Sequence, residues 1–263
     1  MESDAYKVMS FNVLGWTPFP EESDKRAGLI LEMLRCESPD SFGLQECNNR
    51  WIYRLAPPLV EEYAWIGERN EDMQKIYNPV FYRKKKFELI DTKTLWLSDT
   101  PDVWCSNYSA TDQSRMVTYA LLRNRQNGEI YAHFNTHLSI DRPAMQKQLS
   151  ALKKITDSCE YPFVLTGDFN VDDDWHEYQD TLCVYWKDAR KFAPDTTDAP
   201  RGIVKIMDYC FLSDQIRPLK FSVANDPYVI LKQWRNGQTN GQPYYISDHF
   251  PIYVVFRIPT NND

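Results

Sequence analysis

The feature that most constrains the fold of this sequence is a set of short apolar runs, each next to polar side chains that could take part in chemistry. The run Phe163-Val164-Leu165 leads into Gly167-Asp168-Phe169-Asn170, and Ser247-Asp248-His249 stands just before a second apolar run near the C-terminus. Apolar runs of this length are typical of β-strands. We therefore expect the ends of two strands to bring carboxylate, amide and imidazole groups to one place.

Composition and length favour a single large domain. The chain has 263 residues, 43% hydrophobic and 25% charged, so it can bury a sizeable core without disulfides or a structural metal. Neither a linker-like stretch nor a repeat of fixed period divides it, and we expect one domain over 1–263. The acidic, polar start Met1-Glu2-Ser3-Asp4 is unlike a signal peptide or a membrane span. We expect a cytoplasmic monomer that is not an integral membrane protein.

Cysteine usage and net charge narrow the class further. The six cysteines include no Cys-x-x-Cys pair, which argues against a zinc cluster and a disulfide scaffold. Reduced, structural thiols are expected instead. The net charge of −7 counts against a general nucleic-acid surface, whose footprint is basic, while a local basic groove stays open.

Periodicity predicts mixed strands with a few amphipathic helices. Strands are expected at 7–13, 41–44, 80–83, 87–97, 117–123, 130–136, 163–165, 206–212, 221–224 and 252–258. Asn127-Gly128 is expected to turn the hairpin that precedes 130–136. Helices are expected at 24–34, capped by Ser23 or Asp24 and stopped by Pro39, and at 143–155. This mixture predicts an α/β fold in which two sheets pack face to face and are covered by helices.

Asp168 and Asn170 form the first candidate pair. They are two residues apart, so on an extended backbone they face the same way while Phe169 faces the core. The acid could accept a proton from an attacking water, and the amide could donate to a phosphoryl oxygen. An Asx turn that ends the strand is the alternative.

Asp248 and His249 are adjacent, so in a strand they point apart. A partner for His249 must come from elsewhere, and Asp208, which enters the strand Tyr209-Cys210-Phe211-Leu212, is the best candidate. Such a carboxylate would favour the charged form of the imidazole and fix its orientation. His137 also stands at a strand end and is expected to be functional.

Glu46 and Asn12 end two further predicted strands. A carboxylate after an apolar strand is costly to bury unless a cation or a donor pairs with it, and a solvated loop acid is the alternative. A lone asparagine at a strand end usually only caps a turn. Joined to the Asp-Asn and Asp-His pairs, however, Glu46 suits metal-assisted attack on a phosphate ester. The remaining histidines, His133 and His176, are expected to be structural.

Six motifs in this order resemble the endonuclease/exonuclease/phosphatase superfamily over nearly the whole chain. They are Phe11-Asn12-Val13, Leu44-Gln45-Glu46, Asn135-Thr136-His137-Leu138, Gly167-Asp168-Phe169-Asn170, Met207-Asp208-Tyr209 and Ser247-Asp248-His249. The resemblance implies a four-layer α/β sandwich, with two mixed sheets packed face to face and flanked by helices. It also implies a site that depends on Mg²⁺ or Mn²⁺ at one end of the two sheets.

Carried over position by position, the resemblance implies roles for the metal and for the cleft. Glu46 resembles the principal metal ligand, Asn12 its neighbour, and Asp248 a residue that supports the metal side. Asn78 and Arg115 are similar to positions that line the cleft in bacterial relatives, so they are expected to bind substrate.

The same resemblance implies roles in the reaction itself. Asp168 would orient and deprotonate the attacking water, while Asn170 would hold the phosphate and His137 would bind it. His249, steadied by Asp208, would donate to the phosphate oxygen as charge develops there.

Three functions are open at this stage. The first is a metal-dependent phosphoesterase acting on a small molecule or a lipid headgroup, and the second is a nuclease of the same fold. The third, an inactive binding module, is disfavoured because competent residues occupy every position that the chemistry needs. The acidic run Val171-Asp172-Asp173-Asp174 would repel a polyanion if it faced the cleft, which favours the first.

Two further features bear on nucleic-acid binding and on specificity. The one basic run, Arg83-Lys84-Lys85-Lys86, could bind a nucleic acid but is expected to be a solvated hairpin end. Six tryptophans could stack on bases: Trp65, Trp96, Trp104, Trp175, Trp186 and Trp234. Specificity is expected in the loops at 96–115 and 228–245.

Overall fold

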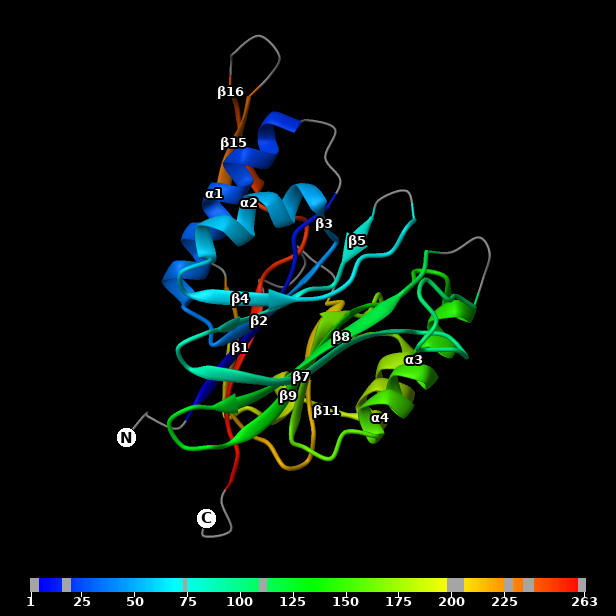
Figure 1. Ribbon diagram of the computed structural model, residues 1–263. Helices are drawn as coiled ribbons and strands as arrows, with labels where there is room; N and C mark the ends of the chain where they lie inside the picture. Colours follow the sequence, from blue (N-terminus) through cyan, green and yellow to red (C-terminus); the bar gives the residue numbers. More distant parts are fainter. Residues whose placement is uncertain are drawn as a thin grey trace.

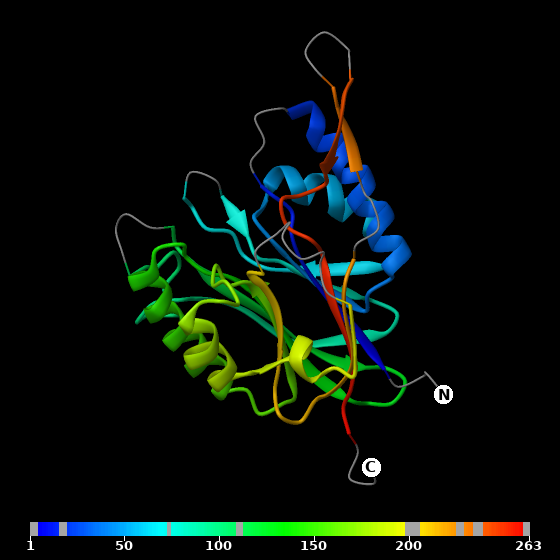
Figure 2. The ribbon, with the colours of Figure 1, turned by 180° about the vertical axis from the view of Figure 1, so that it is seen from behind.

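The computed structural model describes residues 5–15, 20–72, 75–108, 113–197, 206–224, 229–233 and 239–259. Two large sheets face each other, and helices cover their outer faces (Figures 1 and 2). Helices α1 (Pro20–Glu37) and α2 (Asn49–Leu59) lie on one side, and α3 (Arg142–Asp157) and α4 (Cys183–Tyr185) on the other. The predicted sandwich of two mixed sheets flanked by helices is therefore confirmed.

The first sheet has seven strands in the order β12-β14-β17-β1-β2-β6-β4. Their bounds are Asp195–Thr197, Arg217–Val223, Ile252–Arg257, Tyr6–Asn12, Ser41–Gln45, Val80–Arg83 and Tyr63–Ile66. Central strand β1 runs parallel to β2 and antiparallel to β17. The parallel pairing aligns the carboxyl ends of β1 and β2, with Asn12 opposite Gln45.

The second sheet has six strands in the order β11-β13-β10-β9-β8-β7. Their bounds are Lys187–Asp188, Asp208–Leu212, Phe163–Asp168, Ile130–His137, Met116–Asn124 and Phe87–Trp96. Within this sheet, Asp168 at the end of β10 lies opposite both His137 on β9 and Asp208 on β13. This strand register brings three predicted site residues together at one end of these neighbouring strands.

Smaller elements complete the described fold. Two-stranded ladders are formed by β3 (Cys47–Asn48) with β5 (Ile76–Tyr77) and by β15 (Val229–Gln233) with β16 (Thr239–Tyr245). A π-helix, η1 (Tyr178–Leu182), precedes α4, and α5 (Ala189–Phe192) follows β11. None of the described helices is both long enough and apolar enough to span a membrane.

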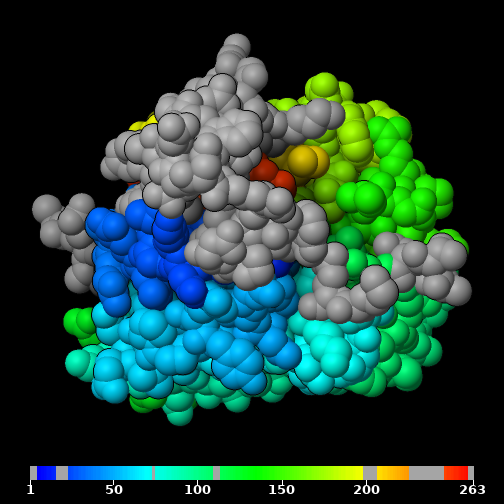
Figure 3. Space-filling model, turned by 90° about the horizontal axis from the view of Figure 1, so that it is seen from above, coloured from blue at the N-terminus to red at the C-terminus, as the bar shows by residue number. Residues whose placement is uncertain are grey.

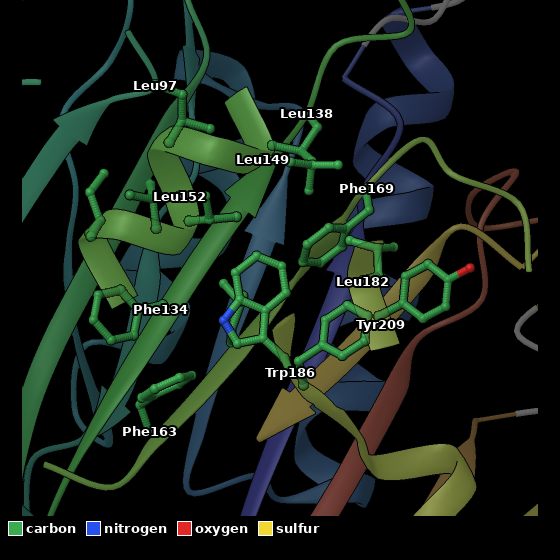
Figure 4. Close-up of a cluster of buried hydrophobic side chains, with 14 of the residues drawn as sticks. Leu97, Phe134, Leu138, Leu149, Leu152, Phe163, Phe169, Leu182, Trp186 and Tyr209 are labelled. Atoms are coloured by element: carbon green, nitrogen blue, oxygen red, sulfur yellow. The ribbon is translucent and has the colours of Figure 1, made fainter. Parts of the chain in front are cut away.

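Three apolar clusters fill the spaces between the four layers. One joins α1 and α2 to the first sheet, around Phe42 and Trp51, and a second lies between the sheets, around Tyr131 and Phe256. The third packs α3 against the second sheet (Figure 4). Phe169, between Asp168 and Asn170 in sequence, belongs to this third cluster and is fully buried. Core packing therefore anchors the chain next to the candidate site.

The two predicted helices are present but longer than expected. The capping prediction for the first is wrong: α1 begins at Pro20, so Ser23 and Asp24 lie inside it. Proline suits the first turn because it lacks an N–H group that would be unpaired there. Ser38, with φ of 51°, follows the last helical residue and precedes Pro39. The cap of α3 is Asp141, whose side chain accepts from the N–H of Ala144.

Helix α2 and the β15–β16 hairpin were not predicted. Pro57 and Pro58 lie inside α2 and disguise its helical pattern, although its N-cap, Asn48, accepts from the N–H of Trp51. Paired strands β15 and β16 occupy much of the stretch expected to be a specificity loop. Residues 228 and 234–238 of that stretch lie outside the described residues.

Asn135 links the two sheets through buried hydrogen bonds. Its Nδ2 donates to the carbonyls of Leu44 at 2.9 Å and Pro79 at 3.0 Å, and its Oδ1 accepts from Gln45 Nε2 at 2.7 Å. The side chain lies so close to β2 that a Cβ built on Gly43 would be 2.3 Å from Asn135 Cγ. Only glycine fits at position 43 without moving this network.

We predict opposite effects from two Gly→Ala substitutions. Gly43→Ala should lower the free energy of unfolding by about 1–3 kcal/mol, because the added methyl group must displace Asn135. Gly28→Ala is the control: nothing lies within 4 Å of its Cβ, and in the middle of α1 it should raise stability by about 0.5–1 kcal/mol. Urea denaturation of both variants measures the difference, and equal stabilities would contradict the tight approach of Asn135.

Candidate active site

The polar residues predicted at strand ends meet where the carboxyl ends of β1, β2, β9 and β10 come together. Figure 3 looks onto this end of the molecule. Part of the C-terminal segment, in red, is visible there beside the orange and green atoms of the second half of the chain. Both sheets therefore contribute to one site.

Asp168 is the hub of this site and is only 2% exposed. Its Oδ2 accepts from Asn12 Nδ2 at 3.0 Å, which joins the second sheet to the first. The same oxygen lies 3.5 Å from His137 Nε2 and 3.7 Å from His249 Nε2. Burial, followed by repulsion from Asp208, raises the pKa of Asp168 to about 7. A carboxylate with this pKa can exchange a proton near neutral pH.

Asn170 reaches the site through a turn. Its φ is 52°, and its N–H donates to Asp168 Oδ1 at 3.0 Å, so the alternative of an Asx turn is correct and the extended geometry is wrong. The turn nevertheless leaves Phe169 in the core, as expected (Figure 4). Asparagine tolerates this left-handed backbone better than most residues.

The amide of Asn170 fixes the proton on His137. Its Nδ2 donates to the carbonyl of Leu138 at 2.9 Å and lies 3.1 Å from His137 Nε2. Because a carbonyl can only accept, the nitrogen is on that side, and Nε2 must accept its second hydrogen. Burial, then the charges of Arg115 and His249, holds the pKa of His137 well below its usual range. His137 is therefore neutral, with its proton on Nδ1.

His249 and Asp208 form the predicted pair. Nδ1 of the imidazole lies 2.6 Å from Asp208 Oδ2. Burial alone would lower the pKa of His249, but the charge and the hydrogen bond of Asp208 outweigh it and raise the pKa to about 10. The site thus holds one charged and one neutral histidine, on either side of Asp168.

Asn12 and Glu46 bring the first sheet into the site. Asn12 is fully buried, and its Nδ2 donates to Glu46 Oε1 at 3.2 Å as well as to Asp168. Glu46 has a φ of 55°, and its Oε2 accepts from the N–H of Gly15 at 2.9 Å. The Glu46 side chain is partly exposed and accepts hydrogen bonds from Asn12 and Gly15. It is therefore neither fully buried nor a freely solvated loop acid.

The donor set suits a hard cation. One ligand atom from each of Asp168, Asp208 and His249 lies within 4.8 Å of the other two, and Asp208 Oδ1 is buried with no hydrogen-bond partner among the described residues. A charged imidazole has no free lone pair, so the carboxylate oxygens are the better ligands. Oxygen-rich sets favour Mg²⁺ or Mn²⁺. Of the predicted ligands, Asp248 is exposed, and its Oδ1 lies 3.3 Å from Ser247 Oγ.

The two predicted substrate-binding residues lie on the His137 side. Asn78 is 1% exposed, and its Nδ2 donates to the carbonyl of Met116 at 3.0 Å. Its Oδ1 has no hydrogen-bond partner in the described part of the chain. Arg115 precedes Met116, and its charge is close enough to lower the pKa of His137. Asn78 therefore holds the start of β8 in place, next to Arg115, whose positive charge disfavours protonation of His137.

Ser247 and Arg26 were missed as functional candidates. Ser247 Oγ donates to the carbonyl of Asn12 at 2.6 Å and accepts from the N–H of His249 at 3.2 Å. Its place in the Ser-Asp-His motif was a usable signal. Arg26 donates to the carbonyls of Val13 and Ile246, on either side of this contact. Nothing in the sequence distinguishes it from an ordinary arginine on a helix.

The charged runs do not form an extended groove. The basic run lies in the turn between β6 and β7, at the opposite end of the sheet from Glu46, and its Arg83 and Lys86 pair with acids. In the acidic run, Asp173 binds Arg190 at 2.6 Å and Asp172 is buried. Lys84 and Lys85 are exposed as expected, but the run connects strands of different sheets, so the prediction of a hairpin end is wrong. Much of the acidic run is neutralised or withdrawn from solvent.

The tryptophans that could stack on bases differ in their exposure. Trp96 and Trp186 are buried, while Trp65 packs on neighbouring aromatic rings. Trp104 is 53% exposed, and Trp175 carries the guanidinium of Arg142 at 4.0 Å from its ring centre. Trp234 lies outside the described residues.

The sequence of this chain is similar to those of known proteins. The sequence profile of the Endonuclease/Exonuclease/phosphatase family matches residues 9–249. "Uncharacterized protein L388" of Acanthamoeba polyphaga mimivirus is 26% identical over 264 residues, covering 89% of this chain and 92% of that protein.

Solved structures share the fold over nearly the whole chain. An endonuclease/exonuclease/phosphatase family protein of Bacteroides thetaiotaomicron is 22% identical with a TM-score of 0.84, covering 97% of this chain and 98% of that one. The mannosyl-6-phosphatase of the same organism is 22% identical with a TM-score of 0.81, covering 95% and 99%. The human Nocturnin catalytic domain is 18% identical with a TM-score of 0.67, covering 97% and 95%.

We predict that Asp208→Asn lowers the pKa of His249. In the wild type, stability from the imidazolium is fully present below pH 6.5 and is lost as pH rises through about 10. Without the Asp208 carboxylate, only the charges of Asp168 and Asp248 oppose the effect of burial, so the pKa of His249 should fall well below its wild-type value. NMR titration of the metal-free protein measures this change. The control is Asp214→Asn, at an exposed position beyond the other end of β13, and an unchanged His249 titration in Asp208→Asn would refute the pairing.

Proposed function

The chain belongs to the endonuclease/exonuclease/phosphatase family, and on that premise we propose that it is a phosphoesterase that depends on Mg²⁺ or Mn²⁺. The observation that carries the proposal is the Asp208–His249 pair, 2.6 Å apart, set against the buried carboxylate of Asp168. Beside it stand a neutral His137 and the Asn12–Glu46 pair from the other sheet. Together they supply a base, a cationic donor and oxygen ligands.

Each side chain has a role that its contacts permit. In this proposal Glu46, Asn12 and Asp248 would hold the divalent cation, which when bound would supply polarisation of the phosphoryl oxygen. Asp168 orients the attacking water and accepts its proton. His249 donates from Nε2, because Asp208 occupies Nδ1 and keeps the ring charged.

In this proposal His137 holds the phosphate, and Asn170 positions His137. Asn170 already uses both amide hydrogens, on Leu138 and His137, so it acts first by orienting the imidazole. His137 Nδ1 is buried with no hydrogen-bond partner among the described residues. An unpaired buried donor beside a site is costly and suits a ligand that completes it. Arg115 would add positive charge on the same side.

We propose a small phosphoester or a lipid headgroup as the substrate, with nuclease activity as the second candidate. The acidic balance and the distant basic run support the small substrate, as does the fold shared with a mannosyl-6-phosphatase. Neutralisation of Asp173 by Arg190 weakens the argument that the acidic run repels polyanions, and it keeps the nuclease candidate open.

We predict metal-dependent hydrolysis that is faster on small phosphoesters than on nucleic acid. The assay compares nitrophenyl phosphate, its diester, a lipid headgroup, RNA and DNA, after EDTA and after add-back of Mg²⁺ or Mn²⁺. Undiminished turnover in metal-free buffer would contradict the cation's role. DNA cleavage faster than every small substrate, with duplex binding that collapses as salt rises, would favour the nuclease.

We predict that His249→Ala lowers kcat by roughly two to four orders of magnitude, the range for loss of a positioned proton donor. His176→Ala is the matched control, because that side chain is 68% exposed and lies outside the site. Steady-state rates on the best substrate of the panel measure both variants. Equal rates for the two would remove His249 from the reaction.

A further inference from the structure

Arg26, on α1, is a fully buried cation that is bonded to backbone. Its Nε donates to the carbonyl of Ile246 at 2.6 Å. Its Nη2 donates to the carbonyls of Val13 and, at 3.3 Å, of Leu14, which also accepts from Nη1 at 3.3 Å. The guanidinium lies 4.8 Å from the ring centre of Trp51 on α2, which is 1% exposed. One side chain thus joins two loops far apart in sequence.

Both loops carry residues of the proposed site. Val13 and Leu14 follow Asn12 directly, and Ile246 precedes Ser247-Asp248-His249. The loops also touch each other, because Ser247 Oγ donates to the carbonyl of Asn12 at 2.6 Å. Arg26 therefore closes a ring of contacts that runs from β1 to the segment holding His249.

The first loop passes this constraint to two acids. The N–H of Leu14 donates to Asn12 Oδ1 at 3.0 Å, which turns the Nδ2 of Asn12 toward Glu46 and Asp168. The next residue, Gly15, donates its N–H to Glu46 Oε2 at 2.9 Å. Leu14 has a φ of 52°, which a leucine adopts only where its surroundings enforce it. Arg26 holds the carbonyl of this strained residue.

We propose that Arg26 is a positioning residue for the site: a buried guanidinium that sets the loop after Asn12 against the loop before His249. The proposal rests on the function proposed above. Arginine suits this role because its planar fork offers several donors at fixed angles, whereas lysine offers a single point. The described contacts of Arg26 are to backbone carbonyls and to Trp51, so it would act through Asn12, Glu46 and His249.

The test compares Arg26→Lys and Arg26→Gln with Arg35→Gln, an exposed position on the same helix. Hydrogen exchange followed by mass spectrometry reports on peptides covering 11–15 and 246–251, with 163–168 as an internal reference. We expect exchange at 11–15 and 246–251 to accelerate at least roughly tenfold in both Arg26 variants and to stay unchanged in Arg35→Gln. Exchange does not require activity, so this arm is independent of the proposed function.

Activity provides the second arm. Displacement of aligned groups should lower kcat by roughly 10–100-fold, with little change in KM, in the Arg26 variants. In Arg26→Ala, millimolar guanidinium chloride should restore part of kcat, and sodium chloride at equal ionic strength should not. A role confined to global stability would instead lower the melting temperature and leave kcat per folded molecule unchanged.

The outcomes separate the two proposals. Unchanged exchange at both loops in folded Arg26→Lys and Arg26→Gln would overturn the positioning role. Failure of both variants to fold would also overturn it, because Arg26 would then be a requirement of the core. Accelerated exchange at both loops, with no hydrolysis of any substrate by the wild type, would retain the clamp and refute the proposed function.

Discussion

A carboxylate with 2% exposure at the junction of the two sheets is the constraint on which this end of the molecule depends. Burying an ionised acid is expensive unless donors and cations surround it. Asp168 receives an amide from Asn12 and the backbone N–H of Asn170, and the charged imidazole of His249 lies 3.7 Å from its Oδ2. The sheets must therefore meet in one register for the charge to be tolerated. The same contacts that compensate the burial also assemble the site.

The two histidines beside Asp168 show how the environment divides roles between identical side chains. His249 has a carboxylate at 2.6 Å, which raises its pKa to about 10. Burial and the positive charges of Arg115 and His249 all disfavour the protonated form of His137, so its pKa lies well below the usual range. One ring is thus a cation and the other a neutral donor at the same pH. Groups whose pKa values are pushed apart in this way are typical of acid–base sites.

The sequence predicted the strand ends because apolar runs and the polar residues after them are local signals. Asp168 and Asp208 lie opposite each other, as expected. The pattern of buried apolar residues along each strand determines how the two strands pair. The turn at Asn170 was misjudged, because an extended and an Asx geometry place the same residues near the site. Helix α2 was missed because Pro57 and Pro58 obscure its pattern. Arg26 could not be found, because its partners are backbone carbonyls more than two hundred residues apart along the chain.

Backbone strain ties these observations together. Leu14, Glu46 and Asn170 all have positive φ, a conformation that costs of order 1–3 kcal/mol for most residues and persists only where contacts over-determine it. Here the contacts come from side chains: Asn12 holds Leu14, Asp168 holds Asn170, and Asn12 reaches Glu46. The strained turns redirect the chain just after rigid strands, so functional groups converge without lengthening the loops. Because Asn12 and Asp168 are themselves candidate site residues, a substitution at either would alter a strained turn and the site together, whereas Arg26 supports the turn at Leu14 from outside the site.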